Sequence, residues 1–372
     1  MEEELLHLIA LTEISGLGQV GVRNLLAVMG DATSIFRERK HLTDYIPKLN
    51  PKVIAALDAP DAFRRAEKEI RFIESNHIRC LTTRSEDYPS RLRECDDAPF
   101  LLFYKGSANL NAVKVINLVG TRHATDYGKQ ICVSFLTDLK SLLPDVLVVS
   151  GLAYGIDICA HRAALANNLE TVGVLAHGLD RIYPSVHRST AVEMLSRGGL
   201  LTEYKSETNP DRQNFVCRNR IVAGMADATI VVESAEKGGS LITADIAESY
   251  HRDCFAFPGR INDPYSKGCN ALIAGNRASL LQSAEDFVKA MCWDVNPAVQ
   301  KKDAIQRQFF PELTEEEQLI VGLLQKNGEM QINALVVQAN ISVSKMSALL
   351  FDLEMKGVIR TLAGGMYRLL GY

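Results

Sequence analysis

The chain has 372 residues, of which 47% are hydrophobic, and its formal net charge is −4. This length predicts two or three domains with buried cores, and the near-neutral charge excludes a protein that is basic over its whole surface, so any nucleic-acid site must be a local patch. The eight cysteines form no Cys-x-x-Cys pair, which favours reduced thiols over a zinc site. With no signal peptide and no apolar run of about 18 residues, we expect a cytoplasmic protein without a membrane span.

Residues 1–77 are expected to form a helical domain of the SAM or helix-hairpin-helix type. Leu5, Leu8 and Ile9 recur at helical spacing, and a Gly16-Leu17-Gly18 turn separates two predicted helices. Exposed N–H groups at the start of the second helix can contact a phosphate. A plain helical hairpin is the other interpretation, because Arg23 is the one basic residue near the turn. The sequence leaves both open.

Residues 78–295 alternate short apolar runs with amphipathic stretches. The runs are rich in β-branched residues, which is typical of buried parallel strands, and helical patterns follow most of them. The predicted strands are 115–119, 146–149, 172–175, 229–232 and 254–257, and the predicted helices are 127–139, 156–166 and 241–250. Repeated strand–helix units predict an α/β fold, an extended Rossmann-like parallel-sheet core with helices on both faces. Ligands of such sheets bind beyond the carboxyl ends of the strands.

Residues 310–372 follow a polar linker at 296–307 and are expected to form a winged-helix-like domain. Thr314 and Glu317 have the spacing of a capping box. Helices are predicted at 316–325, 332–338 and 344–356, and a hairpin at 358–361, Gly364-Gly365 and 366–369. The third helix carries as many acids as bases, so it supplies little attraction for a phosphate backbone. This argues against a transcription factor that binds duplex DNA through the winged helix.

Three loops after predicted strands have the chemistry of anion sites. Gly120-Thr121-Arg122 follows the first strand and Ser150-Gly151 the second, while Lys237 precedes Gly239-Ser240 at the start of a predicted helix. Glycine turns and open N–H groups at helix N-termini favour phosphates. Each glycine-rich loop alone could simply connect a strand to a helix, but three such loops in one sheet favour phosphate binding.

A predicted helix at 214–222 adds cations and an aromatic ring to these loops. Phe215 precedes Arg218, Asn219 and Arg220 by about one turn. Arginines can clamp a phosphate and an aromatic ring can stack on a base. The plainer interpretation is a solvated face with one core aromatic, but the neighbouring loops favour binding.

No catalytic, metal or cofactor site is predicted. No G-x-G-x-x-G follows a strand, and neither a P-loop nor a His-Glu-x-x-His helix is present. His161 is more typical of a core histidine than of a metal ligand. The alternative to a binding protein is a nucleotide- or nucleoside-processing hydrolase on a related core, with Glu233 and Glu236 as the best candidates for a general base.

The ordered motifs between about residues 87 and 290 resemble the DNA-processing protein A family, also called DprA/Smf. The matching segments include Asp87-Tyr88-Pro89, Gly120-Thr121-Arg122, Ser150-Gly151-Leu152-Ala153-Tyr154-Gly155-Ile156-Asp157, Arg218-Asn219-Arg220 and Gly238-Gly239-Ser240. The resemblance implies a non-enzymatic homodimer that binds single-stranded DNA, protects incoming DNA and loads the RecA recombinase during natural transformation.

The resemblance also implies which residues contact DNA. Arg122, Arg220 and Lys237 would be the contacting cations, followed by Phe215 and Asn219 and by the backbone of Gly151 and Ser240. The sequence departs from the family pattern at Thr121, where serine is commoner, at Ala176-His177, where Gly-Thr is common, and at His187, where asparagine is common. Thr121 keeps the hydroxyl, whereas the two histidine positions leave the role of their loop open.

Overall fold

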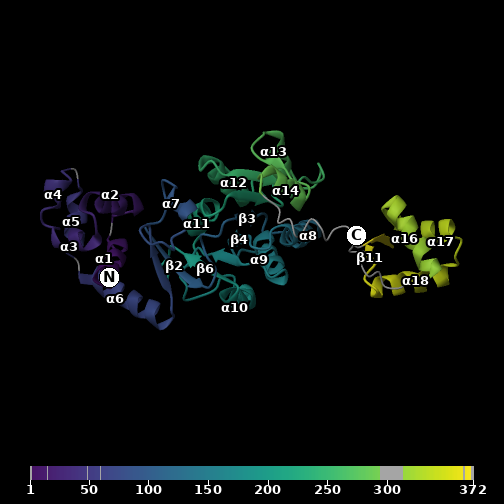
Figure 1. Ribbon diagram of the computed structural model, residues 1–372, viewed down its shortest axis with the longest axis horizontal. Coiled ribbons are helices and arrows are strands. Elements are labelled where there is room, and N and C mark those ends of the chain that lie inside the picture. The colour runs from purple at the N-terminus through teal and green to yellow at the C-terminus, as the bar shows by residue number, and fades with distance from the viewer. Residues whose placement is uncertain are drawn as a thin grey trace. The chain divides into compact units, whose positions relative to one another are not determined.

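The computed structural model describes residues 2–14, 16–47, 49–58, 60–293, 313–362 and 365–369 (Figure 1). The chain divides into two compact units, Met1–Gln300 and Lys301–Tyr372, which are treated separately. The predicted polar linker at 296–307 and Gly364 of the predicted hairpin lie outside the described residues.

The N-terminal segment is helical, as predicted. Asp31 caps α3 by accepting from the Ser34 N–H, and Asn50 caps α5 ahead of Pro51. The helices are α1 (Glu2–Thr12), α2 (Gln19–Met29), α3 (Ala32–Arg37), α4 (Leu42–Tyr45), α5 (Pro51–Leu57) and α6 (Pro60–Ser75). Their buried side chains share one cluster with Phe100, Leu101 and Phe103, so the helices pack against the sheet region within the first unit. The domain boundary at 77/78 stays a prediction.

A nine-stranded sheet forms the centre of the first unit, with the order β1-β2-β6-β5-β4-β3-β7-β8-β9. The strands are β1 (Arg79–Thr82), β2 (Leu101–Gly106), β3 (Val115–Val119), β4 (Leu147–Ser150), β5 (Thr171–Val174), β6 (Gly198–Thr202), β7 (Ala228–Val231), β8 (Asp253–Ala256) and β9 (Ser279–Leu280). The five predicted strands are confirmed as β3, β4, β5, β7 and β8, each within one residue. The sheet is parallel from β6 to β9, whereas β1–β2 and β2–β6 pair antiparallel, which the sequence analysis missed.

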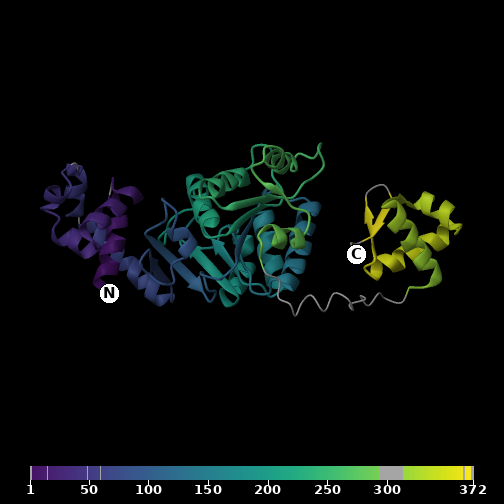
Figure 2. The same cartoon turned by 45° about the horizontal axis from the view of Figure 1, so that its top comes forward.

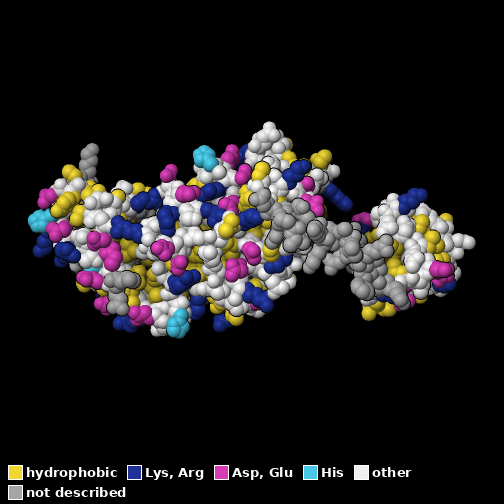
Figure 3. Space-filling model, in the orientation of Figure 1, with side chains coloured by type: hydrophobic (Ala, Val, Ile, Leu, Met, Phe, Trp, Pro, Cys, Tyr) yellow, Lys and Arg dark blue, Asp and Glu magenta, His cyan; other side chains and the backbone are white. Residues whose placement is uncertain are grey.

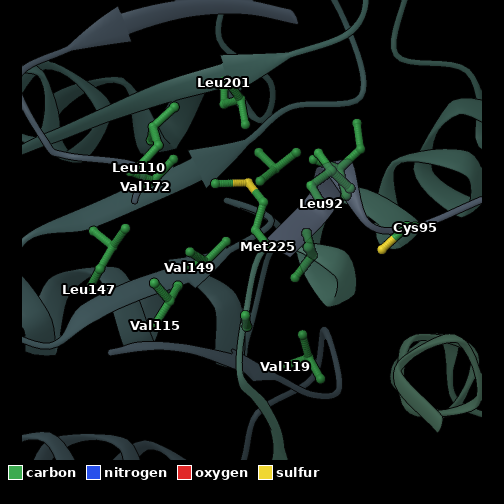
Figure 4. Close-up of a cluster of buried hydrophobic side chains, with 14 of the residues drawn as sticks. Leu92, Cys95, Leu110, Val115, Val119, Leu147, Val149, Val172, Leu201 and Met225 are labelled. Carbon is green, nitrogen blue, oxygen red and sulfur yellow. The ribbon is translucent and has the colours of Figure 1, made fainter. Parts of the chain in front are cut away.

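Helices cover both faces of the parallel part, as a Rossmann-like fold requires (Figure 2). The alternation of side chains along β3 explains this, because Val115 and Val119 belong to one buried cluster and Ile116 and Leu118 to another. The first cluster includes side chains of α7 (Ser90–Arg93), α11 (Arg212–Gly224), α12 (Gly239–Ser249) and α13 (Lys267–Ala274), and part of it is drawn in Figure 4. The second includes side chains of α8 (Asp126–Leu142), α9 (Ile156–Ala166) and α14 (Ala284–Ala290).

The strand order places a topological switch point between β3 and β7. From β3 the chain builds β4, β5 and β6 on one side, and it then returns to add β7 on the other side of β3. The connections from β3 and β7 therefore leave the sheet in opposite directions, which opens a crevice at their carboxyl ends.

The described residues of the second unit form three helices and a small antiparallel sheet, the winged-helix arrangement that the sequence predicts. The helices are α16 (Glu315–Asn327), α17 (Ile332–Ala339) and α18 (Val343–Met355), and the strands β10 (Glu329–Gln331), β11 (Ile359–Leu362) and β12 (Met366–Leu369) lie in the order β10-β12-β11. The predicted capping box of Thr314 and Glu317 is present. Among the described residues, no single helix is long and apolar enough to cross a membrane, and the bent pair α17–α18 meets the criterion by length and composition only.

His161 is a core histidine, as the sequence favoured. Its ring is fully buried on α9, and its Nδ1 lies 2.7 Å from the Thr171 hydroxyl oxygen. Burial, together with the nearby Arg218, lowers the pKa of His161 from 6.5 to about 3. The folded protein therefore holds this imidazole neutral over the whole physiological range.

We expect His161 to make stability fall with acidification. The pKa of His161 is lower in the folded state than in the unfolded chain, so between pH 6.5 and 3 only the unfolded chain takes up the proton. The stabilisation of the folded state is therefore complete above pH 6.5 and declines as the pH falls below that value. Between pH 7.5 and 5.5 the free energy of unfolding should drop by about 1.4 kcal/mol from this group alone. Urea unfolding of the wild type and of His161→Leu at both pH values measures it. Equal pH dependence in the two proteins would contradict the assignment.

Candidate nucleic-acid interface

A pocket of about 810 Å³ lies at the switch point between β3 and β7. The loop after β3, the face of α11 and the first turn of α12 form its walls, and Tyr183 contributes from the segment between β5 and β6. The pocket is the position at which open α/β sheets bind ligands. Of the predicted site residues, it brings together Gly120, Thr121, Arg122, Phe215, Arg218, Asn219, Lys237, Gly239 and Ser240.

The loop after β3 is anchored so that Arg122 faces the pocket. The Thr121 N–H donates to the Glu233 carbonyl, and the Glu233 carboxylate accepts from both the N–H and the hydroxyl of Thr125, the N-cap of α8. Gly120 has no room for a Cβ, which would collide with Ile156. Glu233 therefore serves as a structural cap, and it is not among the residues that line the pocket.

Arg122 lies over an aromatic ring. The Cζ atom of its guanidinium is 5.0 Å from the centroid of the Phe215 ring. The Tyr183 ring is tilted against Phe215 at 6.0 Å between centroids. A cation over an aromatic face next to a second ring provides one group for a phosphate and another for a flat base.

The N-terminus of α12 points its open amides at the pocket. Gly238 is the N-cap, and the first turn has no acidic residue. Within the described part of the chain, the N–H groups of Gly239 and Ser240 have no acceptor. Lys237 is exposed next to them and also lines the pocket. Open N–H groups, the helix dipole and a lysine together favour an anion here.

Arg218 lies beneath the pocket with only 3% of its surface exposed. Its Nη1 donates to the Val174 carbonyl at 2.9 Å, and its Nε has no partner. Burial lowers the pKa of Arg218, and the charge of Asp157 opposes that shift. The guanidinium occupies the space that a Cβ on Gly151 would need, so residue 151 must be glycine for the arginine to fit. The arrangement places a poorly compensated positive charge under the pocket.

The loop after β4 does not offer the open anion cradle that the sequence suggested. The Ser150 hydroxyl donates to the Leu118 carbonyl, and the Gly151 N–H donates to the carboxylate of Asp157. Asp157, in the first turn of α9, thus occupies the position that an external anion would take. Neither Ser150 nor Gly151 lines the pocket, and their predicted DNA contact is not supported by this placement.

Arg220 is also placed away from the pocket. Successive residues of an α-helix turn by about 100°, so Arg220 and Arg218 project in different directions. The Arg220 guanidinium pairs with the buried Glu203 carboxylate and also donates to the Asp97 carbonyl. Glu203 in turn accepts from Gln19 of α2 at 2.6 Å. This geometry indicates a structural ion pair.

Among the pocket residues that sequence reasoning missed, Arg212 supplies a further cation and Tyr183 a second aromatic ring. Arg212 is three residues before Phe215 and seven before Asn219, which is the spacing of one helix face. Extending the helix one turn toward its N-terminus would have found it. Tyr183 comes from an irregular segment, and its approach to Phe215 depends on the tertiary fold.

The charges at the pocket favour an anionic ligand. Four cations line it, Arg122, Arg212, Arg218 and Lys237, against two carboxylates, Asp157 and Asp245. Asp245 is paired with Arg277 and Asp157 binds backbone amides. Figure 3 shows Lys and Arg side chains, with Asp and Glu among them, over the region of α7, α11 and α12. Among the described residues, no group of three His, Cys, Asp or Glu side chains converges on a metal position.

Comparison with known proteins gives consistent matches. The model of DNA recombination-mediator protein A matches residues 79–292, and the model of the DprA winged helix domain matches residues 310–365. The DNA processing protein DprA of Bacillus subtilis is 36% identical over 254 residues, which cover 68% of this chain and 79% of that protein. Protein Smf of Escherichia coli is 31% identical over 307 residues, 82% of this chain and 80% of that protein.

Two solved structures are similar as well. DprA from Streptococcus pneumoniae aligns with a TM-score of 0.62 and 30% identity over 80% of this chain and 99% of that one. DNA processing protein A from Helicobacter pylori, whose structure was studied for its single-stranded DNA binding mode, aligns with a TM-score of 0.53 and 28% identity over 59% of this chain and 97% of that one.

We expect Arg220→Ala to lower stability by about 3 kcal/mol, because it leaves the Glu203 carboxylate buried without its cation. Glu203 is 4% exposed at its side chain, so solvent cannot replace the lost partner. Urea denaturation measures the change in the free energy of unfolding.

The matched control is the double variant Arg220→Met with Glu203→Met, which removes both charges and should be closer to the wild type than Arg220→Ala is. A stable Arg220→Ala protein would show that the ion pair is not structural.

Proposed function

The chain belongs to the DNA recombination-mediator protein A family, and on this premise we propose that its pocket binds single-stranded DNA. One observation carries the proposal: the Arg122 guanidinium lies over the Phe215 ring beside the open N-terminus of α12. This pairs a phosphate-binding group with a ring that can stack on a base. In a duplex the faces of the bases are covered by their neighbours, so a stacking ring favours an unpaired strand.

The contacts follow from the chemistry of each wall. The phosphates lie against the amides of Gly239 and Ser240 and the side chains of Lys237, Arg122 and Arg212, and a base stacks on Phe215. Asn219 is on the same helix face and donates or accepts at a base or sugar. Arg218 contributes its charge from beneath, while Gly120 and Thr121 fix the loop. None of these groups reads a base-pair edge in a groove, so sequence preference is weak.

The wider role is delivery of the strand to a recombinase. The family description as a recombination mediator supports a protein that binds incoming single-stranded DNA in the cytoplasm, protects it and loads RecA onto it during natural transformation. Loading a filament-forming recombinase suits a homodimer that presents two strand-binding pockets. Binding and delivery need no bond to be broken, and Glu233, one of the two candidates for a hydrolytic base, is engaged by the N–H and the hydroxyl of Thr125, the N-cap of α8.

We expect the protein to bind a single-stranded oligonucleotide much more tightly than the duplex of the same sequence at fixed salt. Arg122→Ala or Lys237→Ala should each weaken single-strand binding by about 1.5–3 kcal/mol, the value of a charge-assisted hydrogen bond. Each should also reduce the slope of log K against log salt by about 0.7, the value for one phosphate on a single strand. Fluorescence anisotropy across a salt series measures both quantities.

The control for this series is Lys289→Ala, which removes an exposed lysine from α14, a helix that packs with the opposite buried cluster. It should leave both affinity and slope unchanged. Equal affinity for single strand and duplex, or an Arg122→Ala protein that binds as the wild type does, would refute the proposal.

A truncated protein of residues 1–295 should keep full single-strand affinity. All pocket residues lie in the first unit, and the second unit has a hydrophobic core of its own. The N-terminal helices are retained because they share a buried cluster with β2. Affinity and mass in solution are measured together. A loss of more than about tenfold in affinity from a folded truncated protein would make the winged-helix unit a principal DNA site.

A further inference from the structure

A second cavity, of about 850 Å³, lies in the first unit and shares no lining residue with the DNA pocket. It is open to solvent and is bordered by α1 and α2 on one side and by β1, the loop after it and α7 on the other. The N-terminal helices thus cover this part of the sheet incompletely. A surface cavity of this volume has the size of a small-molecule site.

The body of this cavity is apolar. Leu5, Leu8 and Leu26 line it from the helices, and Phe100 lines it from the start of β2. Cys80 and Cys95 also line it, and burial raises the pKa of their thiols to about 12 and about 11. Both thiols are therefore neutral at physiological pH and add to the apolar surface.

The rim of the cavity carries three arginines, Arg23, Arg84 and Arg93. Arg23 donates to the Ala98 carbonyl and Arg84 to the Gly30 carbonyl. Arg93 donates to the carbonyls of Ser85 and Tyr88, and its Cζ atom also lies 5.7 Å from the centroid of the Tyr88 ring. No carboxylate is paired with any of the three among the described residues, so their charge is not neutralised by a neighbouring side chain.

The two carboxylates at the cavity are already engaged by another group, the N-terminus of α3. Glu4 accepts from the N–H groups of Ala32 and Thr33, at 2.7 and 2.9 Å, and from the Thr33 hydroxyl. Asp31 accepts from the N–H and the hydroxyl of Ser34. Because these carboxylate oxygens face the N-terminus of α3, their negative charge offsets the positive end of that helix dipole rather than the charge of the arginines.

We propose that this cavity binds a small amphiphilic anion, with an apolar chain or ring system among the leucines and a carboxylate or similar head on the arginines. Guanidinium groups bind carboxylates through paired N–H donors, and the apolar lining excludes a ligand that is polar throughout. A neutral apolar ligand leaves the arginines uncompensated. Such an anion contacts both the N-terminal helices and the sheet, so binding stabilises the docking of one on the other.

The test uses 1-anilinonaphthalene-8-sulfonate as the fluorescent probe on the full-length protein. We expect one probe per chain, displaced by octanoate but at least tenfold less well by 1-octanol, which has the same chain without the charge. Saturating oligonucleotide should not displace the probe, because the two cavities share no residue. Equal competition by octanoate and 1-octanol, or displacement by the oligonucleotide, would overturn the proposal.

Two pairs of variants localise the probe. Ala27→Trp adds a ring on an exposed position of α2 that lines the cavity, while Val28→Trp adds the same ring on the next residue, which does not line it. Ala27→Trp should abolish probe binding and Val28→Trp should leave it unchanged.

The second pair tests the charge. Arg84→Gln with Arg93→Gln should weaken octanoate about tenfold or more, the loss expected for a charge-assisted hydrogen bond, and leave 1-octanol unaffected. Arg71→Gln, an exposed arginine on α6 outside the cavity, is the control. Circular dichroism checks that each variant is folded, and folded variants that bind octanoate as the wild type does would refute the charged head site.

Discussion

The pairing of β7 with β3 is the constraint on which the binding pocket depends, and it is fixed at both ends. At the start, the Asp227 N–H donates to the Val115 carbonyl, and the Asp227 carboxylate accepts from the Val115 N–H and from Arg91. At the other end, the Val232 N–H donates to Val119 and the Thr121 N–H donates to Glu233. A shift of β7 by one residue would turn its buried side chains to the opposite face and move the capping carboxylate of Glu233 away from α8. The position of Arg122 is therefore set by strand register.

The pocket also depends on a buried charge that the protein tolerates at a cost. Arg218 is removed from solvent, and no carboxylate oxygen lies within 4 Å of its guanidinium among the described residues. Asp157, whose pKa burial raises, is near enough to interact electrostatically, but it binds the Gly151 amide. In the proposed function, a phosphate of the bound strand compensates the charge of Arg218. Arg218 is already held in one position by the fold. Its charge can therefore attract the proposed ligand without the entropy cost of ordering a long surface side chain.

The sequence predicted most of the parallel core because that signal is local. Apolar β-branched runs such as 115–119 give buried strands, and the glycine turns after them start helices. It missed the antiparallel strands because their signal is not local: β6 begins with Gly198-Gly199, a poor strand pattern, since the Tyr104 ring of β2 occupies the space beside Gly199. Of the predicted site, the structure places the loops after β3 and before α12 at the pocket, and their contact with DNA stays a prediction. The structure does not bring Arg220 and Gly151 to the pocket. Arg220 projects from α11 toward Glu203, with which it pairs. The Gly151 N–H donates to the Asp157 carboxylate. Glu203 lies 17 residues before Arg220, outside its motif. Asp157 lies in the same motif as Gly151, but only the fold shows that its carboxylate accepts from that amide.

The N-terminal helices have a direct structural link to the proposed DNA pocket through the segment between β6 and α11. Lys205 pairs with Glu13, Ser206 donates to Glu69, and Glu207 pairs with Lys68, so three successive residues are held by α6 and the end of α1. Glu203, just before them, joins Gln19 of α2 to Arg220 of α11. This segment leads into the first turn of α11, where Arg212 and Phe215 begin the pocket wall. Because burial lowers the pKa of Lys205 to about 8, its charge and its ion pair weaken as the pH rises past that value. The docking of the N-terminal helices and the position of α11 therefore depend on the same set of contacts, and α11 carries one wall of the pocket.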